Sequence, residues 1–371
     1  MLKYRLLEVG DPAPWFQQSS TSNPHYHFDT AAGRYIVLCF FGTSADEQGR
    51  NMLRIEEHRS LFDDNNIAFF GISIDPGDEK QDRVRESMPG IRFFWDFDGT
   101  VSRLYGAIPM DTESGQVTLR RFWLVLNPTL QIRAIFPVQA DGSDRHEVAG
   151  YLKALPFVGA FSGFPIQAPI IILPNVFEPK FCRRLIDLYE THGGKDSGFM
   201  REVDGKTVGV VDYGHKRRSD FTIEDDELKT ILQRKVVRRI VPEIKKVHQF
   251  DVTRMERYIV VCYNAKTSDH FRPHRDDTTK GTAHRKFALS INLNDDFDGG
   301  EVGFPEYGPQ TFKAPAGGAV VFSCSLLHMV SPVTRGRRFV FLPFLYDDAA
   351  ADLREANNPF LSDQAGHYRK G

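Results

Sequence analysis

The sequence has few cysteines, and their spacing matches neither a disulfide framework nor a zinc site. The 371 residues include four, Cys39, Cys182, Cys262 and Cys324, with no CxxC pair among them. They stand in apolar surroundings such as IVLCFF and VVFSCSLL. Because free cysteine is among the most buried residue types, we expect all four to be small buried side chains.

Long apolar runs are also missing. No stretch approaches the roughly 18 apolar residues that a membrane span requires. The opening MLKYRLLEVGDPAP lacks the apolar segment of a secretory signal. We therefore expect a cytoplasmic location and no membrane partner.

An excess of charge of one sign is absent as well. Lys and Arg number 47 and Asp and Glu 49, so the formal net charge is -2. This balance does not suggest nucleic acid as a partner. Hydrophobic residues make up 41% of the chain, which excludes global disorder, and the length fits two domains of roughly 150 residues or more each.

The first part of the chain alternates strand and helix patterns, which is typical of an α/β layer structure. Residues 34–41 (RYIVLCFF) and 67–74 (IAFFGISI) are continuous apolar runs, as expected for strands buried on both faces. The expected order is strand 34–41, helix 46–65, strand 67–74, helix 79–87, strands 122–126 and 132–137, and helix 145–155.

With the opening motif GDPAPWF at residues 10–16, this order resembles the thioredoxin-like fold of the peroxiredoxin family. In that family the turn after the first buried strand, here residues 40–48, carries the peroxidatic cysteine. This chain has no cysteine there, and neither Thr43 nor Ser44 can replace a thiolate in redox chemistry. Cys39 lies inside the apolar strand, where burial shields it. We expect residues 1–158 to be a scaffold or partner-binding domain without peroxidase activity.

Residues 159–170 are rich in Gly, Pro and small side chains, and we place a linker there, followed by a second domain over residues 171–371. Two amphipathic helices are expected at 179–191 and 225–247, the second with a kink at Pro242. The polar, glycine-rich segment 193–220 between them is a candidate lid. From residue 255 onward, short strands separated by turn residues predict a barrel or jelly roll.

Three residues of this β-rich region suit a divalent metal. His274 and Asp276 form an HxD pair, and alternate residues of a strand point to the same face. His328 follows another strand and can supply a third ligand. Two imidazoles and one carboxylate form a facial triad that leaves positions open for substrate and dioxygen. Asp277 is the alternative carboxylate, although strand alternation favours Asp276.

Around these residues the sequence resembles the prolyl 4-hydroxylase-like group of Fe(II)/2-oxoglutarate-dependent dioxygenases over residues 171–347. The resemblance runs in chain order through Tyr263, FRPHRD, NLN, GGE, His328 and PVTRGRR ending at Arg338. It implies a double-stranded β-helix with iron held by His274, Asp276 and His328. Arg338 would bind the distal carboxylate of 2-oxoglutarate, Tyr263 would contact this cosubstrate, and Arg285 is a candidate on the substrate side.

The resemblance implies an enzyme that hydroxylates an aliphatic C-H bond, in a prolyl or other amino-acid residue of a protein or peptide or in a free amino acid. The reaction would use dioxygen and decarboxylate 2-oxoglutarate to succinate, and ascorbate is a further candidate cofactor. The alternative is a non-catalytic sensor or scaffold whose two domains have both lost enzymatic function. The sequence defines neither the substrate nor the oligomeric state.

Overall fold

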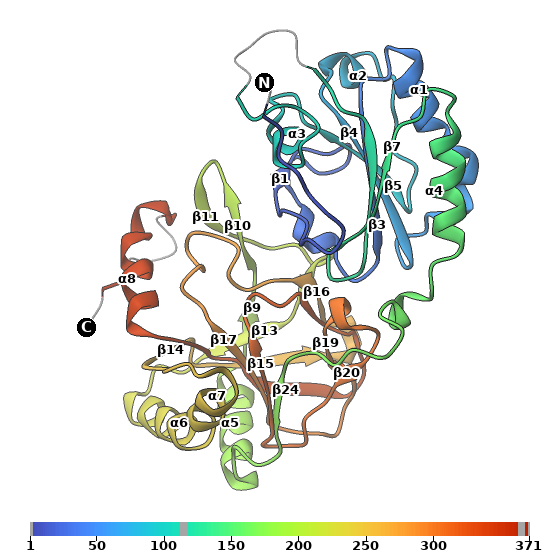
Figure 1. Ribbon diagram of the computed structural model, residues 1–371. Coiled ribbons are helices and arrows are strands. Elements are labelled where there is room, and N and C mark those ends of the chain that lie inside the picture. The colour runs from blue at the N-terminus through green and yellow to red at the C-terminus, as the bar shows by residue number, and fades with distance from the viewer. Residues whose placement is uncertain (1–2, 112–117, 363–367, 370–371) are drawn as a thin grey trace. The chain divides into compact units, whose positions relative to one another are not determined.

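The computed structural model describes residues 3–111, 118–362 and 368–369. The chain forms two compact units (Figure 1). The first consists of Met1–Gln167 with Pro305–Pro309, and the second of Ala168–Phe304 with Gln310–Gly371. The predicted linker, residues 159–170, spans this division. The assignment of Pro305–Pro309 to the first unit was not predicted.

The first unit contains a five-stranded sheet with the order β5-β4-β3-β6-β7. The central strand β3 pairs in parallel with β4 and antiparallel with β6, and every residue of β3 is buried. This confirms the predicted run of residues 34–41 as an interior strand. The sheet strands are β3 (Tyr35–Gly42), β4 (Ile67–Ser73), β5 (Ile91–Trp95), β6 (Phe122–Leu126) and β7 (Ile132–Pro137).

Helices and an aromatic cluster cover this sheet. Val148, Ala149 and Leu152 of the last helix share a core cluster with the strand residues Trp123 and Phe136. In a separate group of aromatic rings, Phe70 stacks on Phe94, and Phe28 contacts Phe94 edge to face. The helical segments are η1 (Phe28–Ala31), α1 (Glu47–Leu53), η2 (Arg54–Leu61), α2 (Pro76–Lys80), α3 (Thr100–Leu104), α4 (Ser143–Lys153) and η3 (Val158–Ala160), and a small sheet is formed by β1 (Gln17–Gln18) and β2 (Tyr26–His27).

Three expectations for the first unit were wrong in detail. The predicted helix 79–87 is the shorter α2, which begins at Pro76 because Asp75 caps it through the Gly77 N–H. The predicted helix 46–65 is divided into α1 and η2, with a non-helical backbone at His58. Strand β5 and helix α3, which lie between α2 and β6, were missed, as were the short elements β1, β2, η1 and η3.

The second unit is a jelly roll built from two main sheets, which confirms the predicted double-stranded β-helix. The larger sheet has the order β14-β25-β17-β24-β15-β13-β9, with β21 and β8 attached through β17. The smaller sheet has the order β12-β16-β22-β19-β20. The larger sheet comprises β8 (Ile171–Leu173), β9 (Lys195–Asp196), β13 (Ser219–Thr222), β14 (Arg254–Glu256), β15 (Ile259–Asn264), β17 (Phe287–Asn292), β21 (Ala319–Ser323), β24 (Arg337–Phe341) and β25 (Phe344–Tyr346).

The smaller sheet contributes the strands that matter most for the site. It comprises β12 (Lys216–Arg217), β16 (His270–His274), β19 (Val302–Gly303), β20 (Thr311–Phe312) and β22 (His328–Val330), and β18 (Asp298–Gly299) pairs separately with β23 (Val333–Arg335). Tyr263 and Val340 of the larger sheet share a core cluster with Phe271 and Val330 of the smaller one. The two sheets therefore pack face to face.

Alternate residues of the larger sheet face a group of helices instead. Leu289 of β17 and Phe341 of β24 share a core with Leu185, Leu232 and Ile244 of these helices. The helices α5, α6 and α7 lie together against the sheet (Figure 1). Their bounds are α5 (Pro179–His192), α6 (Asp226–Arg239) and α7 (Val241–His248), and the C-terminal region adds α8 (Asp348–Ala356) and η6 (Asn358–Phe360).

Two expectations for the second unit need correction. The predicted helix 225–247 is two helices that meet at Ile240, because Pro242 lacks an N–H and is accommodated in the first turn of α7. The predicted polar loop 193–220 contains strands, including the hairpin of β10 (Phe199–Val203) and β11 (Lys206–Val210). Its polar sequence reflects a hairpin that is only partly buried.

The four cysteines are free and buried, as predicted. Burial raises the pKa of the Cys39 thiol well above its ordinary value. None of the helices in the part of the chain that the structure describes combines the length and the apolar character needed to cross a bilayer.

Candidate metal and cosubstrate site

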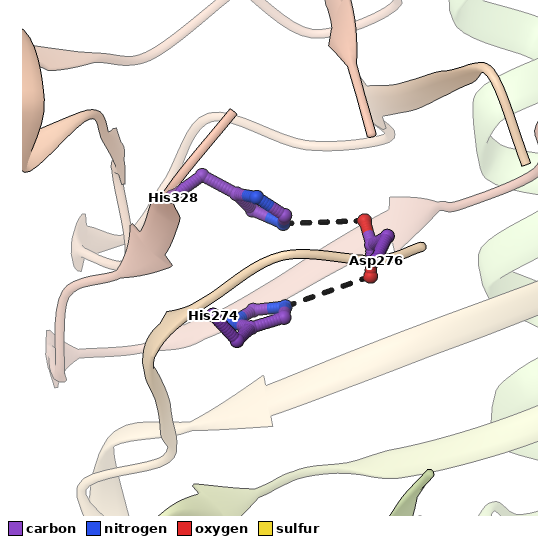
Figure 2. A group of neighbouring side chains, drawn as sticks. All are labelled: His274, Asp276 and His328. Atoms are coloured by element: carbon purple, nitrogen blue, oxygen red, sulfur yellow. Dashed lines mark ion pairs between the residues drawn. The ribbon is translucent and has the colours of Figure 1, made fainter. Parts of the chain in front are cut away.

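Strand pairing in the smaller sheet brings His274, Asp276 and His328 together. His274 at the end of β16 is the cross-strand partner of His328 at the start of β22. Asp276 follows β16 and is positioned by a backbone hydrogen bond from its N–H to the carbonyl of Cys324, 2.9 Å away. One ligand atom from each side chain lies within 4.8 Å of the other two. Figure 2 shows the three side chains converging.

Both imidazoles are held in the orientation that a metal ligand requires. Nδ1 of His274 lies 2.7 Å from the carbonyl oxygen of Arg272, and Nδ1 of His328 lies 2.9 Å from that of Leu326. Since a carbonyl can only accept, each Nδ1 carries a proton, which makes Nε2 the atom of each ring that can bind a metal. Burial, with His328 nearby, holds the pKa of His274 well below its ordinary value.

The carboxylate of Asp276 faces both Nε2 atoms. Oδ1 lies 3.6 Å from Nε2 of His274, and Oδ2 lies 3.3 Å from Nε2 of His328. Burial favours the neutral acid, but His328 and His274 outweigh it and lower the pKa of Asp276. Three electron-pair donors thus converge in a buried place, and a divalent cation between them would satisfy all three. The donor set fits Fe(II).

Asp277, the alternative carboxylate, has a different partner. Its Oδ2 accepts a hydrogen bond from the hydroxyl of Ser325. It does not belong to the group of three converging ligands that the described residues form.

Arg338 and Tyr263 lie on the larger sheet, facing the same cavity as the three ligands. They are cross-strand partners on β24 and β15, and the cavity offers about 60 Å³ to water-sized molecules. The Arg338 side chain is buried and donates from Nε to Asn292 at 3.0 Å and from Nη2 to Ser290 at 2.6 Å. Burial lowers the pKa of Arg338 to about 10, which still leaves the guanidinium charged at neutral pH.

Arg285 is bound differently from the other predicted site residues. Its Nε donates to Oε1 of Glu256 at 2.8 Å, and its guanidinium lies 4.1 Å from the ring centre of Phe344. Phe344 lines the cavity. Arg285 therefore stands behind one cavity residue, and its predicted role beside the substrate stays a prediction.

Sequence reasoning missed two cavity residues, Arg218 and Arg257. Arg218 precedes β13 and donates from Nη1 to the hydroxyl of Tyr263 at 3.1 Å. Arg257 stands between β14 and β15. Arg257 lies two residues before the apolar strand β15, whereas Arg218 lies between the polar strands β12 and β13, so the sequence offered no signal for Arg218.

In the first unit, the turn after β3 holds polar groups that are already paired. Thr43 donates to Asp75 at 2.7 Å and Ser44 to Asp78 at 2.6 Å. Arg121 donates from Nε to the carbonyl of Phe41 at 2.7 Å and also contacts Asp46. The turn contains no thiol, so thiol-dependent peroxide reduction has no nucleophile here.

Comparison with known proteins agrees with this division. The AhpC/TSA family model matches residues 9–143. A PKHD-type hydroxylase from Synechococcus sp. (strain JA-2-3B'a(2-13)) is 31% identical to this chain over 121 residues, which cover 30% of this chain and 53% of the relative. The chain thus spans about half the length of the curated relatives that it matches first.

Two solved structures show partial likeness. A prolyl hydroxylase from Trichoplax adhaerens, solved with a hypoxia inducible factor peptide fragment, has a TM-score of 0.40 and 14% identity and covers 50% of this chain and 86% of its own. A mutant PrxQ from Xylella fastidiosa has a TM-score of 0.34 and 16% identity and covers 40% of this chain and 98% of its own.

Fold and sequence similarity together define the class of each part. The first unit is a thioredoxin-like domain of AhpC/TSA type without the catalytic cysteine. The second is a jelly-roll domain, and the chain is similar in sequence to PKHD-type hydroxylases.

Proposed function

We propose that the second unit is an Fe(II)- and 2-oxoglutarate-dependent dioxygenase that hydroxylates an aliphatic C-H bond. The observation that carries this proposal is the convergence of two imidazole Nε2 atoms and one carboxylate within 4.8 Å, with each Nδ1 bound to a carbonyl. The sequence similarity to PKHD-type hydroxylases supports it.

His274, Asp276 and His328 would hold the iron, and all three line the cavity in which the cosubstrate and the substrate would bind. When bound, iron supplies the redox chemistry that converts 2-oxoglutarate and dioxygen to succinate and carbon dioxide and transfers one oxygen atom to the substrate. Arg338 would pair with the distal carboxylate of 2-oxoglutarate, and Tyr263 lies beside it.

The chain's own residues orient the reactants and exclude water. Ser290 and Asn292 fix the Arg338 guanidinium, so little reorganisation is needed when a carboxylate binds. Phe322, Val330 and Leu342 form apolar parts of the cavity wall. Because this apolar wall excludes water, it would strengthen the ion pair between Arg338 and 2-oxoglutarate and protect reactive species from water.

The substrate we propose is a prolyl or other amino-acid residue in a protein or peptide, or a free amino acid. The test is succinate release by the purified chain with Fe(II), 2-oxoglutarate and ascorbate under air, with and without candidate substrates. Fe(II)-dependent succinate release supports the proposal. Metal binding without any turnover would contradict it and favour a non-catalytic metal-binding protein.

A further inference from the structure

The cavity beside the three ligands contains more positive charge than the proposed reaction uses. Arg218 and Arg257 line it together with Arg338. Arg338 is the residue assigned to 2-oxoglutarate, so the other two guanidinium groups have no role in the reaction described above. Guanidinium groups stay charged in proteins, so this excess persists at any ordinary pH.

Arg218 and Arg257 form ion pairs with the same carboxylate. Oδ1 of Asp220 lies 2.9 Å from Nε of Arg218, and Oδ2 of Asp220 lies 3.2 Å from Nη2 of Arg257. Lys216 is also buried, and it donates to the Ser197 hydroxyl at 2.8 Å. As a basic residue it cannot neutralise the two arginines. One aspartate therefore faces two permanent cations, which leaves at least one positive charge unbalanced.

The neighbouring carboxylate does not correct this imbalance. Glu256 precedes Arg257 in the chain, but its oxygens contact Nε of Arg285 at 2.8 Å and Nη2 of Arg354 at 2.7 Å. Here too, two arginines share one carboxylate. Glu256 is therefore already paired with two other arginines and does not neutralise Arg257.

Arg257 is the residue best placed to receive an anion. Its guanidinium makes one hydrogen bond, to Asp220, within the part of the chain that the structure describes, although it carries five N–H donors. The side chain is 30% exposed, and it lies 5.5 Å from the ring centre of Phe344, another cavity residue. Donors are thus left free on a group that lines the cavity.

The backbone of Arg257 supports a functional role. Its φ of 63° lies in the left-handed region, which is costly for a long side chain. Such strain persists where the surrounding structure requires it, and it is common at binding sites. Here the strained residue aims an incompletely paired cation into the cavity.

The metal and 2-oxoglutarate would not neutralise the positive charge of Arg218 and Arg257. A divalent metal and Arg338 carry three positive charges, which Asp276 and the two carboxylates of 2-oxoglutarate balance. The excess at Arg218 and Arg257 then remains for the substrate to be oxidised. This step rests on the proposed function.

We propose that Arg257, supported by Arg218, binds a carboxylate of the primary substrate, so that the enzyme acts on a carboxylate-bearing compound. A planar guanidinium with free donors matches a carboxylate in two-point contact, and one excess charge matches a monoanion. The carboxylate can be the terminal group of an amino acid or peptide, or the side chain of an acidic residue.

The test uses the full-length chain loaded with Mn(II) and 2-oxoglutarate, with binding measured by calorimetry. The probes are the N-acetylated amino acids, each as the free acid and as the amide. N-acetyl-glutamate amide and N-acetyl-glutamine amide separate a side-chain carboxylate from a terminal one. We expect at least one acid to bind at least about tenfold more tightly than its uncharged counterpart.

Three variants assign this preference to Arg257. In Arg257→Gln, acid and uncharged counterpart should bind within about twofold of each other, and Arg257→Lys should retain part of the preference. Arg254→Gln is the matched control, because it removes an arginine three residues away that contacts Asp348 at 2.8 Å. It should bind the probes like the unaltered chain.

Different outcomes separate the two proposals. If the unaltered chain fails to bind Mn(II) and 2-oxoglutarate, the proposed function is wrong, and this inference falls with it. If both bind but no probe shows a carboxylate preference, or Arg257→Gln keeps the preference, the inference alone is wrong. A loss of 2-oxoglutarate affinity in Arg257→Gln would also overturn it, because Arg257 would then belong to the cosubstrate site. Should Arg257→Gln not fold, the unaltered chain and Arg257→Lys still decide.

Discussion

At the scale of single residues, the proposed iron site depends on the hydrogen bonds that orient its imidazoles. The contacts of both Nδ1 atoms with backbone carbonyls turn the Nε2 atoms toward Asp276 and make Nε2 the ligand atom of each ring. Such outer contacts fix the tautomer of a ligand histidine and tune its affinity. The site is therefore prepared for a metal by the local backbone.

Removing one ligand should abolish metal binding without unfolding the chain. Loss of an outer partner already weakens metal sites by about 10- to 100-fold, so Asp276→Ala should weaken Fe(II) binding by more than about 100-fold. Asp277→Ala is the matched control, since that carboxylate contacts Ser325. The metal content of both variants is measured after dialysis, and circular dichroism tests whether they are folded. Equal metal content in Asp276→Ala and the unaltered chain would contradict the assignment.

Arg338 should control the affinity for 2-oxoglutarate. Truncating one partner of a buried charge pair costs about 2 to 5 kcal/mol, so Arg338→Ala should raise the 2-oxoglutarate requirement at least about 30-fold. Metal binding should survive. Arg337→Ala is the control, because Arg337 is exposed and contacts Glu190 at 3.2 Å. The two variants are compared by succinate release against 2-oxoglutarate concentration, and the assignment fails if Arg337→Ala shows the larger effect.

The sequence could identify the three side chains that converge but not the full cavity. His274 and Asp276 were predictable because the period of two along a strand places both on one face. Arg218 and Arg257 were not, because they enter the cavity through strand pairing between distant segments and through a positive φ at Arg257. Neither feature leaves a local pattern in the sequence.

At the scale of elements, Glu256 at the end of β14 contacts two other segments. It binds Arg285, just before β17, and Arg354 of α8. Burial raises its pKa, but Arg285, His284 and Arg354 outweigh this and hold the pKa of Glu256 below its ordinary value of 4.5. A carboxyl with a lowered folded pKa stabilises the fold above its unfolded pKa, and this contribution is lost as the pH falls.

Glu256→Gln should therefore destabilise the second unit most at neutral pH. Removing one partner of a buried ion pair costs about 3 to 5 kcal/mol. The difference from the unaltered chain should shrink as the pH falls below about 4.5, where the unfolded carboxyl becomes protonated. Urea unfolding from pH 7 to pH 3 measures this, with Glu355→Gln on the exposed side of α8 as the control. A pH-independent difference would show that the charge of Glu256 does not stabilise the fold.

Elements with a strong apolar pattern were predictable and short polar ones were not. Strands β3 and β4 have every residue buried, so their sequences are continuous apolar runs. Helix α3 has five residues, too few to show a helical period. The hairpin of β10 and β11 is only partly buried, so its strands keep the polar composition of a loop.

At the scale of the whole molecule, the chain joins a thioredoxin-like unit without a catalytic thiol to a proposed oxygenase unit. Cys39 is fully buried in β3, and burial raises its thiol pKa. The full-length chain should therefore not consume hydrogen peroxide in the presence of dithiothreitol, and Cys39→Ala should leave succinate release unchanged. Peroxide consumption that disappears in Cys39→Ala would show that Cys39 is a reactive thiol.

The central claim, that the chain is an Fe(II)- and 2-oxoglutarate-dependent dioxygenase, is tested most directly by following the oxygen atoms. The full-length chain is supplied with Fe(II), 2-oxoglutarate and dioxygen labelled with oxygen-18, and the succinate is analysed by mass spectrometry. A dioxygenase places one labelled atom in each succinate, even when no primary substrate is present. We predict singly labelled succinate that requires both Fe(II) and Asp276. Unlabelled succinate, or labelled succinate formed equally by Asp276→Ala, would contradict the account.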